Sequence, residues 1–360
     1  MKSTAWNLFG RSLDGSEPPL IVAELSANHR QDLGLALATV EAARESGADV
    51  VKFQHFRAEH LAAEGDIEDL IVGRGSAWEG RRLVDLYREA EMPWEWTAPL
   101  ASRCEEIGLG WFSSPFDFQA VDFLVEHRVQ AIKIASFELV DLPLIRHAAE
   151  TGLPLILSTG MASELEIEGA VSAASEAGNH RVVLLKCNSS YPAKTGEMNL
   201  TMIKEFRSRW GLPVGLSDHT TDWLSAVVSV GLGSCMIEKH FILDRKLGGP
   251  DAHFSLSPDE FSELARQVRL AHQSLGTLSF GPTESEISSL QFRRSLRATM
   301  DIPEGQPITT ENVRSLRPSG GLAPENLKGI LGRRTSALIR KGSPITNELL
   351  SSESSIPDES

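Results

Sequence analysis

Two histidines, each at the end of a short apolar run, have the type and spacing of a metal-binding pair. His219 ends V-G-L-S-D-H, and His240 ends C-M-I-E-K-H. Both runs are too short for helices, and the stretch between them, Asp222 to Leu232, has a helical pattern, as in a βαβ unit. The ends of neighbouring parallel strands lie about 4.8 Å apart, so these imidazoles can share one divalent ion. The alternative is a pair of core histidines.

Lysine occurs inside three apolar runs, where a buried unpaired ammonium costs several kcal/mol. These are Lys52 in V-V-K-F-Q, Lys133 in A-I-K-I-A-S and Lys186 in L-L-K-C-N. Each requires an anionic partner, which is either a ligand or a carboxylate of the chain itself. Hydroxyl groups gather near the ends of the same runs, at Ser113, Ser114, Ser136, Ser158, Thr159, Ser189 and Ser217. Serines at loop starts are often turn formers, but serines interleaved with lysines indicate a phosphate or carboxylate ligand.

Carboxylates complete the candidate site. Glu24 lies inside I-V-A-E-L, where exposure to solvent is not expected, and Glu238 faces the same side of its run as His240. Glu138 follows K-I-A-S-F directly, and Asp251 lies in G-G-P-D after the last run. Solvation at the surface is the default for an acid. A carboxylate near a metal can act as a general base or bind a sugar hydroxyl, so we treat Glu24, Glu138 and Asp251 as candidate catalytic residues.

The apolar runs recur regularly from Leu20 to about Leu275. Eight of them alternate with helical stretches such as Leu33–Ser46 and Ser163–Ala177. This order predicts a (β/α)₈ TIM barrel with its active site at the carboxyl ends of the strands. A doubly wound open sheet, the alternative, usually has a Gly-rich phosphate turn after its first strand, and none occurs here. A long insertion from His55 to Met92 interrupts the pattern, and loops of this length are usually functional or disordered.

The pattern changes after the barrel. We predict a barrel domain over residues 1–275, a polar linker over 276–292, a small β-rich domain over 293–350 and a disordered tail over 351–360. Within the small domain, D-I-P-E-G-Q-P-I and L-I-R-K-G-S-P-I echo each other.

Composition excludes several classes of partner. The chain has 35 Lys and Arg against 49 Asp and Glu, a formal charge of −14, which argues against nucleic acid and anionic membranes as partners. No apolar run reaches the roughly 18 residues of a membrane span, and the first residues lack a secretory apolar core. Cys104, Cys187 and Cys235 show no metal-ligand spacing, so we interpret them as buried small hydrophobes in a reducing compartment. The expected location is cytoplasmic.

The ordered motifs of this chain resemble those of the sialic acid synthases. They are A-E-L-S-A-N-H, K-F-Q, F-S-S-P-F-D, K-I-A-S-F-E, S-T-G-M, L-K-C-N-S-S-Y-P, G-L-S-D-H-T and E-K-H-F-I-L-D. The resemblance covers nearly the whole chain, and the C-terminal domain looks like the antifreeze-like (SAF) module of that family. The segments W-E-G-R-R-L-V-D-L-Y-R-E-A-E-M-P-W-E-W and F-D-F-Q-A-V-D-F-L look like the pseudaminic acid synthase branch.

This resemblance implies that phosphoenolpyruvate condenses with an open-chain N-acetylated amino sugar. For the branch, the sugar is 2,4-diacetamido-2,4,6-trideoxy-altrose and the products are pseudaminic acid and phosphate. A synthase for N-acetylneuraminic or legionaminic acid is the nearest alternative. A Schiff-base aldolase with Lys133 or Lys186 as nucleophile is an alternative of another class. A non-enzymatic sugar-binding or ice-binding protein is the third, suggested by the C-terminal module alone.

The resemblance also assigns roles to single residues. Phosphoenolpyruvate would be held by Lys52 and Ser114 at its carboxylate and by Lys133, Ser136, Ser158, Ser189 and Ser217 at its phosphate. A divalent cation (manganese, cobalt, zinc or, less naturally, magnesium) would be held by His219 and His240 and would polarise the sugar aldehyde. Glu24 would activate or position the attacking water, and Glu138, Tyr191 and Asp251 would contact the sugar or the reacting oxygens. In a domain-swapped homodimer, Arg317 would reach the sugar in the neighbouring subunit.

Four positions depart from the family pattern. Arg30 stands in place of the second Asn of N-H-N, and His55 stands where K-x-Q-T-Y or K-x-Q-T-F is usual. Thr97 stands where a His is expected after P-W-E-W, and Asn188 stands in the motif C-T-S-A-Y-P. We expect these changes to lie near the sugar end of the site, where they affect the choice of substrate and not the type of reaction.

Overall fold

The computed structural model describes residues 6–65, 67–73 and 78–351. The chain forms two compact units, Met1–Gly276 and Thr277–Ser360, and each is described by itself. The predicted disordered tail lies outside the described residues, apart from Ser351.

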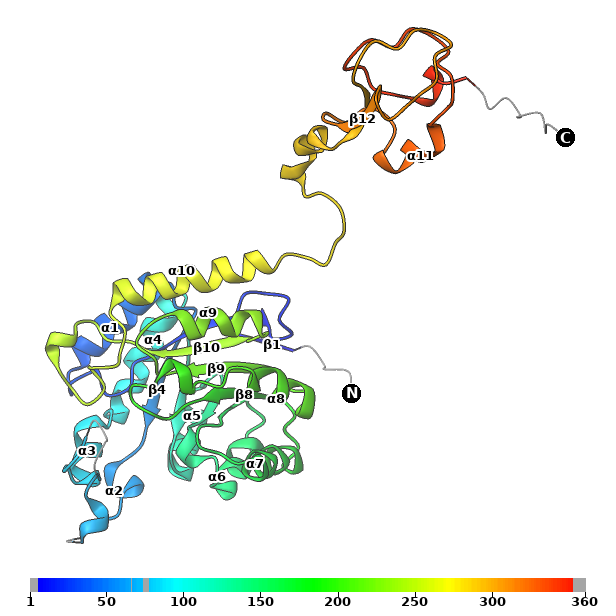
Figure 1. The fold of residues 1–360 in the computed structure, drawn as a ribbon. Helices are drawn as coiled ribbons and strands as arrows, with labels where there is room; N and C mark the ends of the chain where they lie inside the picture. Colours follow the sequence, from blue (N-terminus) through cyan, green and yellow to red (C-terminus); the bar gives the residue numbers. More distant parts are fainter. Residues whose placement is uncertain (1–5, 66, 74–77, 352–360) are drawn as a thin grey trace. The chain divides into compact units, whose positions relative to one another are not determined.

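The first unit is a closed barrel of eight parallel strands, as predicted (Figure 1). Around the barrel the strands follow one another in the order of the sequence, and the last one pairs with the first. Their bounds are β3 (Leu20–Glu24), β4 (Val50–His55), β5 (Gly110–Pro115), β6 (Ile132–Ile134), β7 (Leu155–Ser158), β8 (Val182–Cys187), β9 (Val214–Asp218) and β10 (Met236–His240). Because strands of such a barrel are buried on both faces, they are continuous apolar runs rather than alternating ones. The polar residues within them therefore need a specific reason.

Helices cover the outside of the barrel (Figure 1). They are α1 (Leu33–Glu45), α4 (Thr97–Glu106), α5 (Phe118–Glu126), α6 (Leu142–Glu150), α7 (Glu164–Glu176), α8 (Met202–Trp210), α9 (Leu224–Gly231) and α10 (Pro258–Leu275). Local signals fix their starts. For example, Ser163 and Glu166 form a capping box at α7, and the Asp32 side chain accepts from the Leu35 amide at α1.

A short N-terminal hairpin, which the sequence pattern did not reveal, packs against the barrel. Its strands are β1 (Asn7–Leu8) and β2 (Arg11–Ser12), and its turn residue Phe9 contacts Phe112 with ring centroids 6.0 Å apart. Gly110 allows this approach, since a Cβ at that position would lie 2.6 Å from the Phe9 ring. The hairpin is too short for periodicity to detect it.

The insertion after β4 is structured where it is described. It contains α2 (Ala58–Leu61), the 3₁₀ turn Glu68–Leu70, α3 (Leu83–Ala90) and the 3₁₀ turn Trp94–Trp96. Side chains join its two ends. His55 Nε2 lies 2.7 Å from Thr97 Oγ1, and the Ala58 amide donates to Glu91 at 2.8 Å. The described part of the insertion is therefore folded, and hydrogen bonds connect its first and last residues.

The second unit is a small β-rich domain with its own apolar core. It contains the antiparallel pair β11 (Ser295–Ala298) and β12 (Val313–Leu316) and the short helix α11 (Leu327–Ile330). The two echoing segments pair with each other, because Ile302 and Ile339 exchange backbone hydrogen bonds of 2.7 and 2.9 Å. Both side chains are buried in the core of this unit. The sequence echo thus corresponds to a structural pairing.

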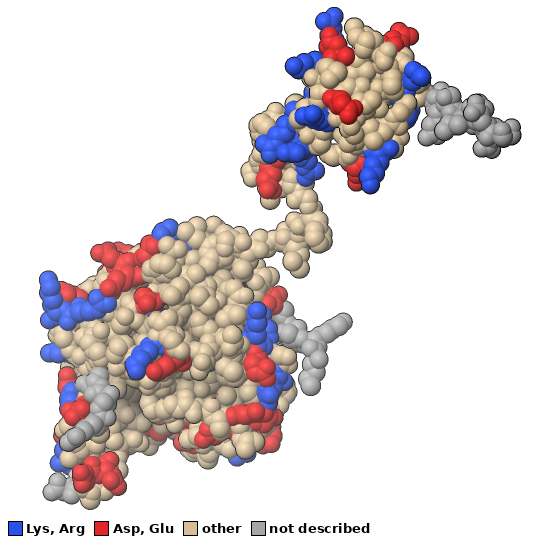
Figure 2. Space-filling model, in the orientation of Figure 1, with Lys and Arg blue, Asp and Glu red and all other residues tan. Residues whose placement is uncertain are grey.

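Lys and Arg side chains are interspersed with Asp and Glu on the visible face of each unit (Figure 2). None of the helices in the described ranges is long and apolar enough to cross a membrane.

Candidate active site

A cavity of about 360 Å³ lies where the barrel strands end. Ten residues singled out from the sequence line it: Lys52, Lys133, Ser136, Glu138, Ser158, Tyr191, Ser217, His219, His240 and Asp251. They come from strands and loops far apart in the sequence, and the closed barrel brings them to one end. The structure therefore assembles most of the predicted site in one place.

The two histidines lie next to each other, as expected of neighbouring strand ends. Their ring centroids are 5.4 Å apart. His219 Nδ1 donates to the Asn188 carbonyl at 2.7 Å, which leaves Nε2 with its lone pair. His240 Nδ1 is buried without a hydrogen-bond partner and lies 3.9 Å from the Asp251 carboxylate. Burial, followed by the charges of His219 and nearby lysines, holds the pKa of His240 well below its ordinary value.

Burial would lower the pKa of His219, but the Cys187 side chain outweighs it and raises this pKa. A neutral imidazole is the form that binds a metal, so His240 with the adjacent Nε2 of His219 fits a divalent cation. The unpartnered buried nitrogen of His240 is the observation that favours this interpretation. Among the described residues, however, no group of three or more His, Cys, Asp and Glu side chains is arranged to hold a metal ion. Further ligands of a cation at the two histidines would therefore be water or substrate oxygens, as in catalytic sites with open positions.

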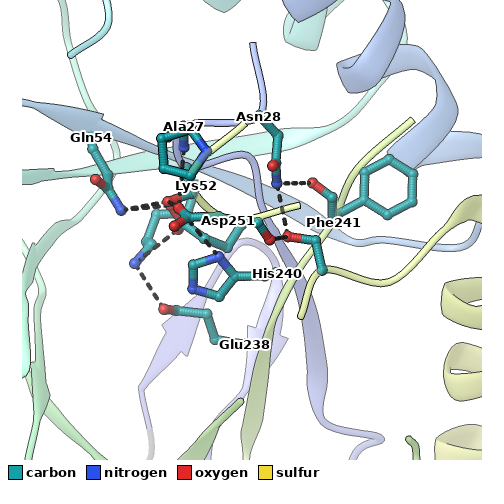
Figure 3. Close-up of polar contacts among 12 residues, drawn as sticks. Ala27, Asn28, Lys52, Gln54, Glu238, His240, Phe241 and Asp251 are labelled. Carbon is teal, nitrogen blue, oxygen red and sulfur yellow. Dashed lines mark hydrogen bonds and ion pairs between the residues drawn. The ribbon is translucent and has the colours of Figure 1, made fainter. Parts of the chain in front are cut away.

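Buried charges form a compact cluster beside His240 (Figure 3). Lys52 Nζ lies 2.8 Å from Glu24 and 2.7 Å from Glu238, and Lys133 Nζ lies 3.7 Å from Glu238. Burial lowers the pKa of Lys52 to about 8 although Glu238 opposes this. Burial would raise the pKa of Glu238, but the charges of Lys133 and Lys52 outweigh it and lower this pKa. Without a ligand, Lys52 is thus paired with carboxylates of the chain, which was the alternative left open by the sequence.

Glu24 is fully buried and does not line the cavity. Besides its contact with Lys52, it accepts a hydrogen bond from Gln54 Nε2 at 3.0 Å. Gln54 Nε2 also donates to Ser26 Oγ at 3.1 Å. The Ser26 hydroxyl in turn donates to the Asp251 carboxylate. Gln54 therefore connects the charge cluster to the acid at the mouth of the barrel.

Serine hydroxyls converge around Gly160. The Gly160 amide approaches Ser136 Oγ at 3.1 Å, and a Cβ at Gly160 would lie 2.7 Å from that oxygen and closer still to Ser189 Oγ. Ser158 Oγ is buried without a hydrogen-bond partner. These groups form a cradle of small donors in which only glycine fits at position 160. Ser189 is half-buried beside the cavity, and Ser114 is buried at the end of β5 and does not line it.

Besides Glu238, the acids that line the cavity are Glu138 and Asp251. Burial raises the pKa of Glu138 to about 7, and one of its oxygens is buried without a hydrogen-bond partner. Burial also raises the pKa of Asp251, although the Ser26 hydroxyl and the Ala27 amide partly oppose this. Tyr191 lies over His219, with ring centroids 4.2 Å apart. Asp251 lies beside His240, and Glu138 is close enough to Lys133 and Lys52 to be affected by their charges. Proton transfer from either acid to a substrate in the cavity is chemically feasible.

Glu138→Gln is expected to stabilise the protein above pH 7 and to change its stability little near pH 5. Because burial raises the pKa of Glu138 from 4.5 to about 7, the folded chain binds more protons than the unfolded chain between these values. Stability therefore falls as pH rises through this window, and glutamine avoids that loss. Urea unfolding at pH 5 and pH 8.5 should show a gain of about 1–3 kcal/mol at the higher pH. Glu126→Gln, at an exposed position, is the control. Equal effects of the two substitutions at both pH values would contradict the interpretation.

Three other predictions from the sequence need correction. Lys186 does not join Lys52 and Lys133 at the active-site cavity. It lines a second cavity with residues of α7 and α8, and its Nζ donates to the Cys187 carbonyl at 2.6 Å. Cys104 and Cys235 are buried thiols whose pKa burial raises to about 12, but Cys187 lines the active-site cavity. There burial is outweighed by His219, Ser136 and Lys133, and the pKa of Cys187 is lowered to about 6.

The third correction concerns the four departures from the family pattern, none of which lines the cavity. His55 and Thr97 are both buried and hydrogen-bonded to each other, so the two departures form one pair at the base of the insertion. Asn188 contributes its carbonyl to His219, and Arg30 is exposed. Arg317 lies in the second unit, where it is exposed after β12.

A closed (β/α)₈ barrel with lysines, histidines and acids around one cavity at its strand ends is the architecture of a barrel enzyme with an anionic substrate. Residues 39–279 match the model of the NeuB family, and residues 293–351 match the SAF domain. The chain belongs to the NeuB family.

Similar proteins include several named synthases. The pseudaminic acid synthase of Helicobacter pylori is 40% identical over 336 residues, which cover 92% of this chain and 97% of that protein. The N,N'-diacetyllegionaminic acid synthase of Legionella pneumophila is 35% identical over 346 residues, with coverage of 93% and 97%. The crystal structure of N-acetylneuraminic acid synthetase from Leptospira borgpetersenii superposes with a TM-score of 0.71 at 32% identity, covering 80% of this chain and 95% of that one.

Proposed function

We propose that this chain is a pseudaminic acid synthase. It would condense phosphoenolpyruvate with 2,4-diacetamido-2,4,6-trideoxy-altrose and release pseudaminic acid and phosphate. The observation that carries this proposal is the cavity itself, in which paired lysines, a serine cradle and two adjacent histidines meet in a chain 40% identical to a pseudaminic acid synthase. An N-acetylneuraminic or legionaminic acid synthase, the nearest alternative, would use the same site with another sugar.

The lysine cluster and the serine cradle suit phosphoenolpyruvate, an anion with two charged ends. Lys133 with Ser136, Ser158, Ser189 and Ser217 would hold the phosphate, and Lys52 the carboxylate. The binding of these anions would draw Lys52 and Lys133 from the carboxylates of Glu24 and Glu238, which neutralise them in the free enzyme. The sequence assigned Ser114 to the carboxylate of phosphoenolpyruvate. Because Ser114 does not line the cavity, its effect on this carboxylate would be indirect.

The opposite end of the cavity suits the sugar aldehyde. His219 and His240 would hold a divalent cation, whose positive charge polarises the aldehyde when it is bound. Tyr191 lies against both rings and limits where a sugar can lie. Asp251 and Glu138, both at raised pKa, are placed to move protons at the new hydroxyl of the product.

In the reaction, C3 of phosphoenolpyruvate forms a bond to the aldehyde carbon of the sugar, and the aldehyde oxygen takes up a proton. Water then adds to C2 of the former enol, and the C2–O bond to phosphate breaks to leave the 2-keto acid. The buried Glu24, joined to Lys52 and Gln54, would position this water through the network that they form. Cleavage of the C–O bond also separates this reaction from that of a Schiff-base aldolase. Of the two candidate nucleophiles of such an aldolase, Lys186 lines another cavity, and Lys133 lines the active-site cavity with its Nζ 3.7 Å from Glu238.

The test is phosphate release from phosphoenolpyruvate over a panel of sugars. The panel comprises the altro and manno forms of 2,4-diacetamido-2,4,6-trideoxyhexose and N-acetylmannosamine. We expect the largest kcat/KM for the altro sugar. A larger kcat/KM for the manno form would identify a legionaminic acid synthase, and a larger one for N-acetylmannosamine an N-acetylneuraminic acid synthase.

We also propose a cytoplasmic homodimer in which Arg317 of each chain serves the barrel of the other. The SAF unit is small, with a core of nine buried apolar residues, so it gains stability from a surface to pack against. An arginine offers several donors in one plane for the oxygens of a sugar. Arg317 is exposed and therefore accessible to such a partner.

A further inference from the structure

One side of the active-site cavity is apolar, and this side comes from the insertion between β4 and α4. We call it the insertion wall, consisting of Leu61, Val72, Trp78, Leu83, Leu86 and Tyr87, all of which line the cavity. Phe116 and Phe137, from the loops after β5 and β6, extend the apolar lining. The sequence identified the insertion as a long interruption of the barrel but gave it no role. Its position at the cavity indicates a role in substrate recognition.

The insertion wall is fixed in place by contacts to the rest of the site. Trp78 Nε1 donates to the Pro250 carbonyl at 2.9 Å, directly beside Asp251. The Trp78 ring also lies 5.7 Å from the ring of Tyr191, between centroids. On the other side, Phe56 packs against Tyr87 at 5.8 Å and against Phe116 at 5.3 Å. The wall is thus packed between the barrel and the loop that carries Asp251.

Charge and polarity divide the cavity into two sides. The strand ends supply Lys52, Lys133 and Glu238 together with the serine cradle and the histidine pair. The insertion wall adds aliphatic and aromatic groups to this lining, and the side-chain polar groups of its six residues are the Trp78 N–H, which donates to the Pro250 carbonyl, and the Tyr87 hydroxyl. Burial raises the pKa of Tyr87, and the Glu138 charge adds to this effect. A matching ligand is charged or polar at one end and carries methyl groups at the other.

We propose that the insertion wall is the subsite for the methyl groups of the sugar, above all the C6 methyl of a 6-deoxy sugar. This inference rests on the proposed function and specifies its substrate class. A hydroxyl at C6 would lose its hydrogen bonds to water and contact only apolar side chains of the wall. Burying an unpaired hydroxyl in this way is unfavourable. A methyl group in the same place loses no hydrogen bond and buries apolar surface. The wall therefore selects 6-deoxy diacetamido sugars over sugars with a hydroxymethyl group, and it leaves the choice between altrose and mannose to other residues.

The experiment uses two sugars that differ only at C6. One is 2,4-diacetamido-2,4,6-trideoxy-altrose, and the other is its counterpart with a hydroxyl at C6. Leu83 is half-buried in the first turn of α3, and Leu83→Asn replaces its two methyl groups by an amide on a side chain of the same branching. Leu83→Met keeps the wall apolar. Ile71→Ser changes an apolar residue of the same insertion that is 45% exposed and does not line the cavity.

We expect the unmodified enzyme to prefer the 6-deoxy sugar about 10- to 100-fold in kcat/KM, the range for one hydroxyl in an apolar pocket. Leu83→Asn should lower this ratio about tenfold and leave the KM for phosphoenolpyruvate unchanged. Leu83→Met and Ile71→Ser should keep the ratio.

Three results would overturn the proposal. The first is equal loss of kcat/KM for both sugars in Leu83→Asn, which indicates a structural role of the wall. The second is an unchanged ratio. The third is an unmodified enzyme that turns over both sugars equally well. Absence of turnover with either diacetamido sugar, combined with turnover of N-acetylmannosamine, would instead remove the proposed function and with it the 6-deoxy subsite.

Discussion

Replacement of His240 by alanine is expected to lower kcat/KM about a thousandfold or more. The proposed cation would polarise the aldehyde and supply several kcal/mol of transition-state stabilisation, and each 1.36 kcal/mol is a factor of ten in rate. His240 is the residue to change because its Nδ1 is buried without a partner, while its ring lies 5.4 Å from that of His219. Removal of metal from the unmodified enzyme with a chelator should have the same effect, and added manganese or cobalt should reverse it.

Metal content measured by elemental analysis gives a readout that does not depend on turnover. His240→Ala should lose the bound metal and retain affinity for phosphoenolpyruvate, because the lysine cluster and the serine cradle stay in place. His180→Ala is the matched control, since His180 is exposed after α7, away from the cavity. A metal-free preparation with full activity would exclude a metal at this pair.

The barrel could be predicted from the sequence because its strands are short apolar runs separated by helices with clear starts. The positions of Lys52, Lys133, His219 and His240 at the cavity follow from that prediction, since the carboxyl ends of barrel strands meet at one end. What periodicity could not give is the face of the barrel toward which each side chain points. Strands buried on both faces show no alternation of polar and apolar residues. The sequence pattern therefore does not show which of two successive residues faces the inside of the barrel.

Lys186 illustrates this limit. Lys186 lines the cavity beside α7 and α8 and not the active-site cavity, whereas Cys187 lines both, which agrees with successive residues of a strand pointing to opposite faces. In the sequence both residues belong to one apolar run, and the lysine was the more conspicuous. In the structure the Ser189 hydroxyl lies 3.7 Å from the Cys187 thiol. Ser189 follows the end of β8, so strand alternation in the sequence did not show which of Lys186 and Cys187 faces the active-site cavity.

Contacts across large sequence separations were also beyond prediction. Lys52 and Glu238 are 186 residues apart and form a 2.7 Å ion pair, and His55 and Thr97 form a hydrogen bond across the whole insertion. Each of the latter two departs from the family pattern when taken alone. Together they form a buried hydrogen bond, so the two departures belong to one structural feature of this chain. Gly160 was likewise part of a quoted motif, but the need for glycine there depends on Ser136 and Ser189.

Mixing two inactive variants, Arg317→Ala and His240→Ala, is expected to restore activity. If Arg317 serves the barrel of the neighbouring subunit, each variant alone lacks one necessary part in every site. In a mixed dimer, the barrel of the Arg317→Ala chain keeps both histidines and receives an intact arginine from the other chain. After complete exchange at equal amounts, half of the dimers are mixed and each has one intact site, so about a quarter of the sites should be active.

Phosphate release measures the recovery, and mass-labelled subunits show that exchange has occurred. The control replaces the second variant by a chain with both substitutions, which can supply neither histidine nor arginine and should restore nothing. Arg317 is exposed, and its substitution removes no buried contact, so loss of activity in Arg317→Ala should come without loss of folding. No recovery despite complete exchange would mean that Arg317 acts within its own chain. Full activity of Arg317→Ala alone would mean that it has no part in the site.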